Sequence, residues 1–201
     1  MAYTDFTLSD LHQKFGIENR KGSLFPNVKP VQVSKKLKSD LGYNLELPQR
    51  SEKAKSELIV LPILLDVRLR NDRFFTIYSG EILSADPETG LNGECDFIVA
   101  KDTQSFEINY PIFQIVEAKK NDIDLGVPQC AAQMVGARVF NQKKGLITDT
   151  VFGCVTTGDD WNFMKLAGNT ITVDERRYYL GSLPELLGVF QLIIDFYKNS
   201  I

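Results

Sequence analysis

Hydrophobic spacing along this chain switches between a helical period and a strand period, and the switches mark its predicted elements. Helices are expected over five segments: 7–16, 34–41, 52–66, 124–142 and 182–197. Thr7 and Ser51 are suitable N-caps, and Gly16 ends the first helix. Pro62 is expected to bend the third helix, because proline lacks a backbone donor and crowds the preceding turn. Residues 17–33 are expected to form an extended connector.

Runs of aromatic and β-branched residues separated by turn residues predict the strands. They are expected over residues 74–83, 93–102, 111–119 and 151–158, and residues 161–174 form a predicted hairpin that turns at Gly168-Asn169. Residues 86–93 and 101–110 are expected to be turns between the first three strands. In the second strand, alternation puts Cys95, Phe97 and Val99 on one face, and Asp96, Ile98 and Ala100 on the other.

The order of these elements predicts the fold class. A helix, three strands, a helix, a strand, a hairpin and a last helix indicate an α/β protein with a central mixed β-sheet flanked by α-helices. The length of 201 residues fits one domain, and 43% hydrophobic residues suffice for a core.

Charge and cysteine content narrow the class of protein. The net charge of −3 and the pI near 5.3 argue against a highly basic nucleic-acid-coating protein, although a local basic groove stays compatible with them. The three cysteines form no CxxC pair and lie among apolar or small residues, which indicates reduced core thiols in a cytoplasmic protein. No apolar run of membrane-spanning length and no signal peptide are recognised, so no membrane association is expected.

The single histidine, His12, restricts the chemistry. It lies in the first predicted helix, where we expect it at the surface. Catalytic triads and zinc sites built on histidine need more imidazoles, so carboxylates and lysines must carry any reaction.

Two acids and a lysine form the candidate site. Glu117 and Lys119 lie two positions apart at the end of the third strand, so they point to the same face. Asp96 is an isolated acid inside an apolar strand, which is costly to bury without a function. Pairing of the two strands would bring Asp96 beside Glu117, where a hard divalent cation between them would relieve their repulsion.

This arrangement resembles the PD-(D/E)XK nuclease superfamily, whose members share a restriction-endonuclease-like fold. Asp96 is followed after about twenty residues by Glu117-Ala118-Lys119, and Cys95 replaces the proline of the motif. The segment VTTGDDWNF is also similar to the nuclease domain of type I restriction motor subunits. The resemblance spans roughly residues 50–195. It implies a nuclease-like domain over residues 49–201, preceded by an N-terminal helical extension over 1–48 and packed with it as one unit.

The resemblance also implies roles for individual residues in metal-assisted hydrolysis of DNA with Mg²⁺ or Mn²⁺. Asp96 and Glu117 would be direct metal ligands, joined by the backbone carbonyl of Ala118. Lys119 would position or activate the attacking water, and Glu57 would bind the metal through water or hold a second ion. The residues expected near the substrate are Gln129, Gln133 and Lys120.

Several of these residues have simpler explanations. Glu57 could pair with Lys53 across one helical turn, and Glu52 competes with it, although the helix dipole already favours an acid in the first turn. Glu117 and Lys119 could form a solvated pair. Gln129 and Gln133 could decorate an exposed helix face.

Two other functions stay open beside a nuclease. One is a catalytically inactive relative that binds nucleic acid or a protein. The other is an oligomerisation module, with the small residues of 131–137 as the seam of a homodimer. A partner protein could also supply sequence specificity, because no separate reading domain is visible.

Overall fold

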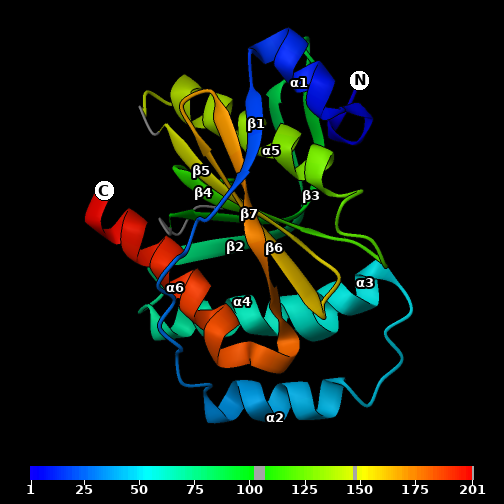
Figure 1. Ribbon diagram of the computed structural model, residues 1–201, viewed down its shortest axis with the longest axis vertical. Coiled ribbons are helices and arrows are strands. Elements are labelled where there is room, and N and C mark those ends of the chain that lie inside the picture. Colours follow the sequence, from blue (N-terminus) through cyan, green and yellow to red (C-terminus); the bar gives the residue numbers. More distant parts are fainter. Residues whose placement is uncertain (102–106, 147–148, 201) are drawn as a thin grey trace.

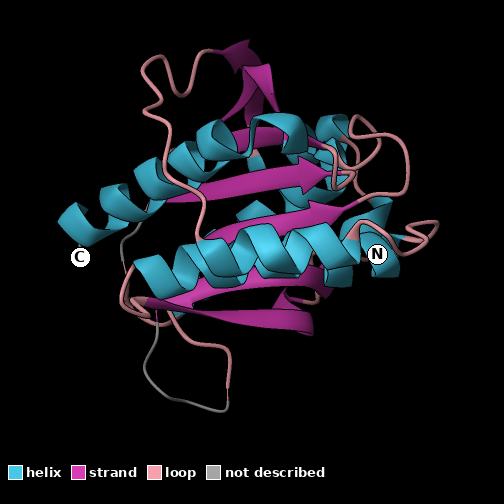
Figure 2. Ribbon diagram, turned by 90° about the horizontal axis from the view of Figure 1, so that it is seen from below, coloured by secondary structure: helices cyan, strands magenta, loops and turns pink. Residues whose placement is uncertain are grey.

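The computed structural model describes residues 1–101, 107–146 and 149–200. A seven-stranded mixed sheet lies between two helical layers (Figures 1 and 2). The strands are β1 (Glu18–Gly22), β2 (Phe75–Asp86), β3 (Leu91–Lys101), β4 (Ile112–Ala118), β5 (Thr150–Thr156), β6 (Asp160–Ala167) and β7 (Thr170–Tyr179). The helices are α1 (Leu8–Phe15), α2 (Lys35–Asn44), α3 (Glu52–Lys55), α4 (Leu61–Arg70), α5 (Val127–Lys143) and α6 (Leu183–Ser200), with short helical turns η1 (Tyr3–Asp5), η2 (Ser56–Val60) and η3 (Leu180–Ser182).

The strand order is β1-β7-β6-β5-β4-β3-β2. Strands β2, β3 and β4 are antiparallel, and β4 is parallel to β5 because α5 connects them as a crossover. Strands β5, β6 and β7 are again antiparallel, and β1 is parallel to β7. The predicted α/β class with a mixed sheet flanked by helices is therefore confirmed.

Each face of the sheet has its own apolar core. On one face α5, α1 and η1 cover a cluster that includes Cys130 and Met134 of α5 and Leu11 of α1. On the other face α4 and α6 cover an aromatic cluster around Trp161 and Phe190. Both faces are buried along β4, and all seven of its residues are buried.

Strand β1 was not predicted. Residues 17–33 were expected to be an extended connector, but Glu18–Gly22 pair with β7 at the edge of the sheet. Glu18 to Lys21 are all exposed and polar, so no apolar alternation marks the strand. The N-terminal extension thus contributes a strand of the central sheet as well as helices.

The predicted helix 52–66 continues to Arg70 and contains a π-helical turn, η2. The N–H of Leu61 donates to the carbonyl of Ser56, and Pro62 then lies at the start of α4. A missing N–H is tolerated in the first turn of a helix, so the π turn accommodates the proline.

The predicted alternation in β3 holds only in part. Phe97 and Val99 do lie in the aromatic cluster, but Cys95 packs on the α5 face with Ile98 and Ala100. Pairing of β3 with β4 ends at Phe97, so β4 does not constrain the preceding residues. Half of the turn expected over residues 101–110, residues 102–106, lies outside the described residues.

The small residues of α5 pack inside the molecule. Ala131, Ala132 and Ala137 are fully buried, and a Cβ on Gly136 would lie 2.1 Å from the hydroxyl oxygen of Tyr3. The seam proposed for a homodimer at 131–137 is therefore wrong, because this chain's own sheet and η1 cover it.

The last helix is long and apolar enough, over Leu180–Ser200, to cross a membrane by length and composition alone. Its apolar side packs on the sheet, with Leu186, Phe190 and Ile193 buried in the core. A core helix passes the same test, so this feature does not indicate a membrane location.

Candidate functional site

The carboxylate of Glu117 lies at the end of β4 under the first turns of α5. Only 3% of the residue is exposed. The Nζ of Lys119 donates to Oε1 at 2.9 Å, and the Nε2 of Gln129 donates to the same oxygen at 2.5 Å. The Nε2 of Gln133 donates to Oε2 at 2.9 Å. Three donors therefore offset part of the cost of burying this acid.

Asp96 reaches the same place from β3. Its Oδ2 accepts the backbone N–H of Ala118 at 2.7 Å. The β3–β4 ladder ends at the pair Phe97 and Val116, so this N–H is free to bind a side chain instead of a strand. The Asp96 carboxylate thus takes the place of a backbone acceptor of the β3–β4 ladder, and this hydrogen bond holds Asp96 against the end of β4.

Both carboxylates face one cavity of about 330 Å³. Lys119, Gln129 and Glu52 line it as well. The structure thus brings together Asp96, Glu117 and Lys119, which the sequence predicted from strand pairing alone.

The charges in the cavity shift one another's titration. Burial, with the Asp96 carboxylate as the next cause, raises the pKa of Glu117 from 4.5 to about 7. Burial also raises the pKa of Asp96, against the hydrogen bond from Ala118 and the charge of Lys119. Burial alone would lower the pKa of Lys119, but the charge and hydrogen bond of Glu117, together with the charges of Glu52 and Asp96, outweigh burial and raise the pKa. Lys119 is therefore an ammonium ion, and one positive charge faces two carboxyl groups.

This donor set fits a magnesium-like ion. Mg²⁺ keeps several waters and takes one or two carboxylates, which is what Asp96 and Glu117 offer. The Oε1 of Gln133 is buried behind Glu117 without a hydrogen-bond partner among the described residues, but Gln133 does not line the cavity, so this oxygen offers no ligand to an ion there. Within the described ranges, no group of three or more His, Cys, Asp or Glu residues is placed to hold a metal ion. A bound ion would thus rely on two carboxylates, backbone oxygen and water.

Glu57 does not join the site. It is exposed and its Oε1 lies 3.9 Å from the Nζ of Lys53, the simpler alternative considered above. Glu52 takes the predicted place, because its Oε1 accepts the backbone N–H of Lys120 at 3.1 Å. The Nζ of Lys55 also donates to the carbonyl of Lys120 at 2.6 Å, so the start of α3 is fixed beside the end of β4.

The three predicted substrate residues differ in placement. Gln129 lines the cavity, where its Oε1 accepts from Lys119 at 2.9 Å. Gln133 is fully buried and also donates to the carbonyl of Glu94, so it supports Glu117 and is out of reach of a substrate. Lys120 is exposed and does not line the cavity, although its backbone N–H donates to Glu52, which does.

Sequence reasoning missed two parts of the cavity wall. Glu94 lines it two residues before Asp96, and Ala2, Tyr3 and Thr4 close one side. In the sequence GECD, Glu94 lies two positions before Asp96, and this second acid was a signal that the sequence offered. No local signal marks the N-terminal segment, because its position depends on long-range packing of Tyr3 against α5.

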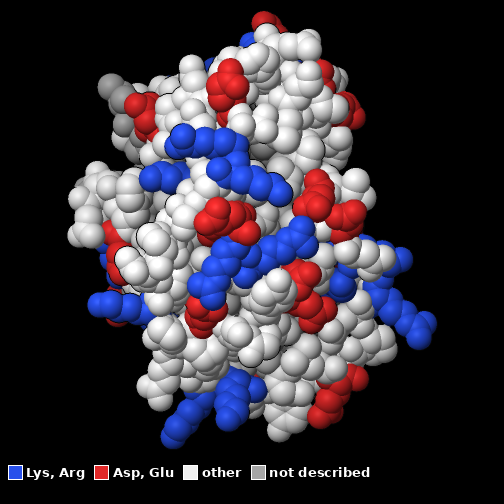
Figure 3. Space-filling model, viewed as in Figure 1, with Lys and Arg blue, Asp and Glu red and all other residues white. Residues whose placement is uncertain are grey.

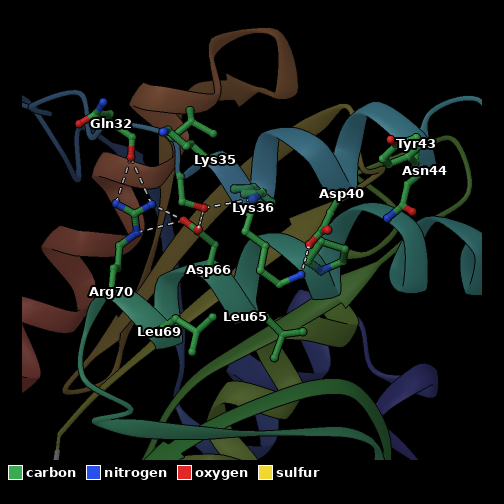
Figure 4. A pocket seen from close by; sticks show the side chains of 14 residues that line it. Gln32, Lys35, Lys36, Asp40, Tyr43, Asn44, Leu65, Asp66, Leu69 and Arg70 are labelled. Atoms are coloured by element: carbon green, nitrogen blue, oxygen red, sulfur yellow. Dashed lines mark hydrogen bonds and ion pairs between the residues drawn. The ribbon is translucent and has the colours of Figure 1, made fainter.

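A larger cavity, of about 630 Å³, lies elsewhere, between α2 and α4 (Figure 4). Its charged groups largely pair with each other. Asp66 accepts hydrogen bonds from Ser34 and Arg70, and Lys36 pairs with Asp40 at 2.7 Å. None of the predicted site residues lines it, so its size alone does not make it the reactive site.

Comparison with known proteins does not assign the chain to a family. No protein-family model matches the sequence, and no curated protein matches it significantly.

Proposed function

We propose that this protein is a metal-dependent nuclease of the PD-(D/E)XK type, with a restriction-endonuclease-like fold, that hydrolyses phosphodiester bonds in DNA. One observation carries the proposal: the carboxylates of Asp96 and Glu117 and the ammonium group of Lys119 face one cavity. A buried and a half-buried acid with raised pKa values, and a lysine paired with one of them in the same cavity, are typical of catalytic sites.

Each group has a role that follows from its contacts. Asp96 and Glu117, with the carbonyl of Ala118, would hold Mg²⁺ or Mn²⁺. The ion, when bound, would stabilise negative charge on the phosphate and lower the pKa of a bound water. Lys119 would orient the attacking water and stabilise charge on the phosphate, and Gln129 fixes Lys119 against Glu117.

A second candidate is a nuclease-like module without activity that binds nucleic acid or a protein. The observation that favours it is the occupation of Glu117, both of whose oxygens already accept hydrogen bonds from side chains. For an ion to bind through Oε1, Lys119 or Gln129 must release that oxygen, because it already accepts two hydrogen bonds. An inactive module would keep these bonds permanently.

Cleavage of DNA in Mg²⁺ separates the two candidates. We expect wild-type protein to cut plasmid or single-stranded DNA, and Lys119→Met to lose at least about a hundredfold in rate, as expected on removal of a charge-stabilising or proton-transfer group. Glu52→Gln should reduce the rate, whereas Glu57→Gln should not, because only Glu52 lines the cavity. A wild-type rate in Lys119→Met, or equal effects of the two glutamine variants, would refute the assignment.

A further inference from the structure

A second cleft lies on the same face of the sheet as the candidate site. Its volume is about 300 Å³, and we call it the β7 cleft. Three basic residues line it: Arg20 and Lys21 of β1, and Arg177 of β7. It is built by the strands that extend the sheet beyond β5, together with Leu8 of α1 and Val127 of α5.

The strand registers place this cleft on the same face as Glu117, at the same level along the strands and three strands away. Glu117 pairs with Val155, Val155 with Asn162, and Asn162 with Arg177. Side chains of directly paired residues point to the same face. Arg177 therefore lies on the face that carries Glu117, three strand spacings or about 14 Å away. This distance corresponds to about four nucleotide rises along one strand of a duplex.

The segment 124–129 separates the two cavities and lines both of them. Gln129 lines the cavity that Asp96 and Glu117 face, which we call the catalytic cavity, and Asp124 lines the β7 cleft. Between them Gly126 lies on the sheet, and a Cβ there would come within 2.5 Å of Cγ1 of Val155. The N-terminus of α5 thus lies between the two cavities, and its dipole adds positive potential there.

Three acids also line the β7 cleft, and they differ in how firmly they are engaged: Glu175 is exposed at its rim. Asp174 is buried, and it accepts hydrogen bonds from the backbone N–H of Arg176 and the hydroxyl of Tyr178. Asp124 pairs with Arg177 at 2.9 Å, but the side chains are 76% and 41% exposed, so this ion pair contributes little and exchanges easily.

Lys21 is the cation of the cleft that is available to a ligand beside Arg177, because it is paired with Val173 on the α5 face and forms no ion pair with any described residue. Arg20 is paired with Thr172 and donates to its hydroxyl at 3.3 Å, so its guanidinium group is directed to the opposite face. Figure 3 shows basic side chains gathered in front of β1 and β7, with acids between them.

We propose that the β7 cleft binds the phosphate backbone of the nucleic acid whose scissile phosphate lies in the catalytic cavity. Arg177 is the main contact: it exchanges the carboxylate of Asp124 for a backbone phosphate, which its planar guanidinium binds in two-pronged geometry. Asp124 holds Arg177 over the cleft until the phosphate arrives. This inference rests on the proposed function, because it assigns the path of that substrate.

Binding of labelled DNA by fluorescence anisotropy at several salt concentrations tests it, with every variant carrying Asp96→Asn to prevent cleavage. Arg177→Ala should weaken binding roughly three- to tenfold and reduce the salt slope by about one. Asp124→Asn should strengthen binding, because it removes the competing anion.

Arg176→Ala is the matched control. It removes the same charge from the neighbouring position, but that side chain points to the other face, where it pairs with Glu185 at 2.6 Å and covers the ring of Tyr178. Its affinity and salt slope should match the Asp96→Asn parent.

The outcomes separate this inference from the nuclease proposal. Equal effects of Arg177→Ala and Arg176→Ala, or weaker binding by Asp124→Asn, would overturn the β7 cleft, while Mg²⁺-dependent cleavage lost in Lys119→Met would leave the nuclease standing. Wild-type protein that neither cuts nor binds DNA would overturn both.

Discussion

The buried carboxyl group of Glu117 is expected to reduce the stability of the metal-free protein at neutral and alkaline pH, and Glu117→Gln should remove this effect. The pKa of Glu117 is raised from 4.5 to about 7 in the folded protein. Because the folded state holds the proton more tightly than the unfolded state, the linked stability is fully present below about pH 4.5. It is lost as the pH rises to about 7.

The size of the effect follows from that difference. At about 1.4 kcal/mol for each pH unit, the change from 4.5 to about 7 corresponds to about 3 kcal/mol of unfolding free energy. Only 4% of the Glu117 side chain is exposed, so screening by solvent reduces this free energy only slightly. Most of the loss should fall between about pH 5 and pH 8.

Urea unfolding across this range, in buffer with a chelator, measures the effect. The wild-type protein should lose about 3 kcal/mol relative to Glu117→Gln between the two ends of the range. Titrating groups outside the cavity are common to both proteins and cancel in the comparison, whereas Asp96 and Lys119 interact with Glu117 and belong to the measured difference. Parallel pH profiles of the two proteins would refute the reasoning, because they would mean that Glu117 titrates alike in the folded and unfolded chains.

Three further substitutions test packing, two of them beside the site and one in the aromatic core on the other face of the sheet. Gly126→Ala should destabilise the protein by about 1–3 kcal/mol and displace Lys119, because the new Cβ would lie 2.5 Å from Val155 and 2.9 Å from the lysine Cγ; an unchanged melting temperature would contradict this. Tyr3→Phe should be neutral or stabilising by about 1 kcal/mol, since the buried hydroxyl has no hydrogen-bond partner among the described residues; a clear loss in thermal unfolding would reveal a bond. Tyr197→Phe should cost about 1–3 kcal/mol in urea unfolding, because its hydroxyl lies 3.0 and 2.8 Å from two backbone carbonyls; no cost would mean that neither contact stabilises the fold.

Elements with strong periodicity could be predicted from the sequence. The apolar run of β4, the helical stripe of α5 and the hairpin at Gly168-Asn169 all appear close to their expected places. Strand β1 could not be found in the same way, because its exposed polar residues gain only backbone pairing along β7.

The candidate site was predictable to the extent that strand geometry decides it. Alternation and pairing were enough to bring Asp96, Glu117 and Lys119 together. The helical acid was not predictable, because the choice between Glu52 and Glu57 depends on how α3 docks on the loop after β4. A π turn also rotates the helix out of the phase that a regular helix would give.

The central claim is that Asp96 and Glu117 share one divalent ion. Titration calorimetry with Mn²⁺ at about pH 7 tests it most directly, since the raised pKa of Glu117 adds a second signature to the binding heat. We predict one site that is absent in Asp96→Ala, with proton release detected as a dependence of the heat on the buffer. No Mn²⁺ binding by the wild-type protein, or equal binding by Asp96→Ala, would contradict the account.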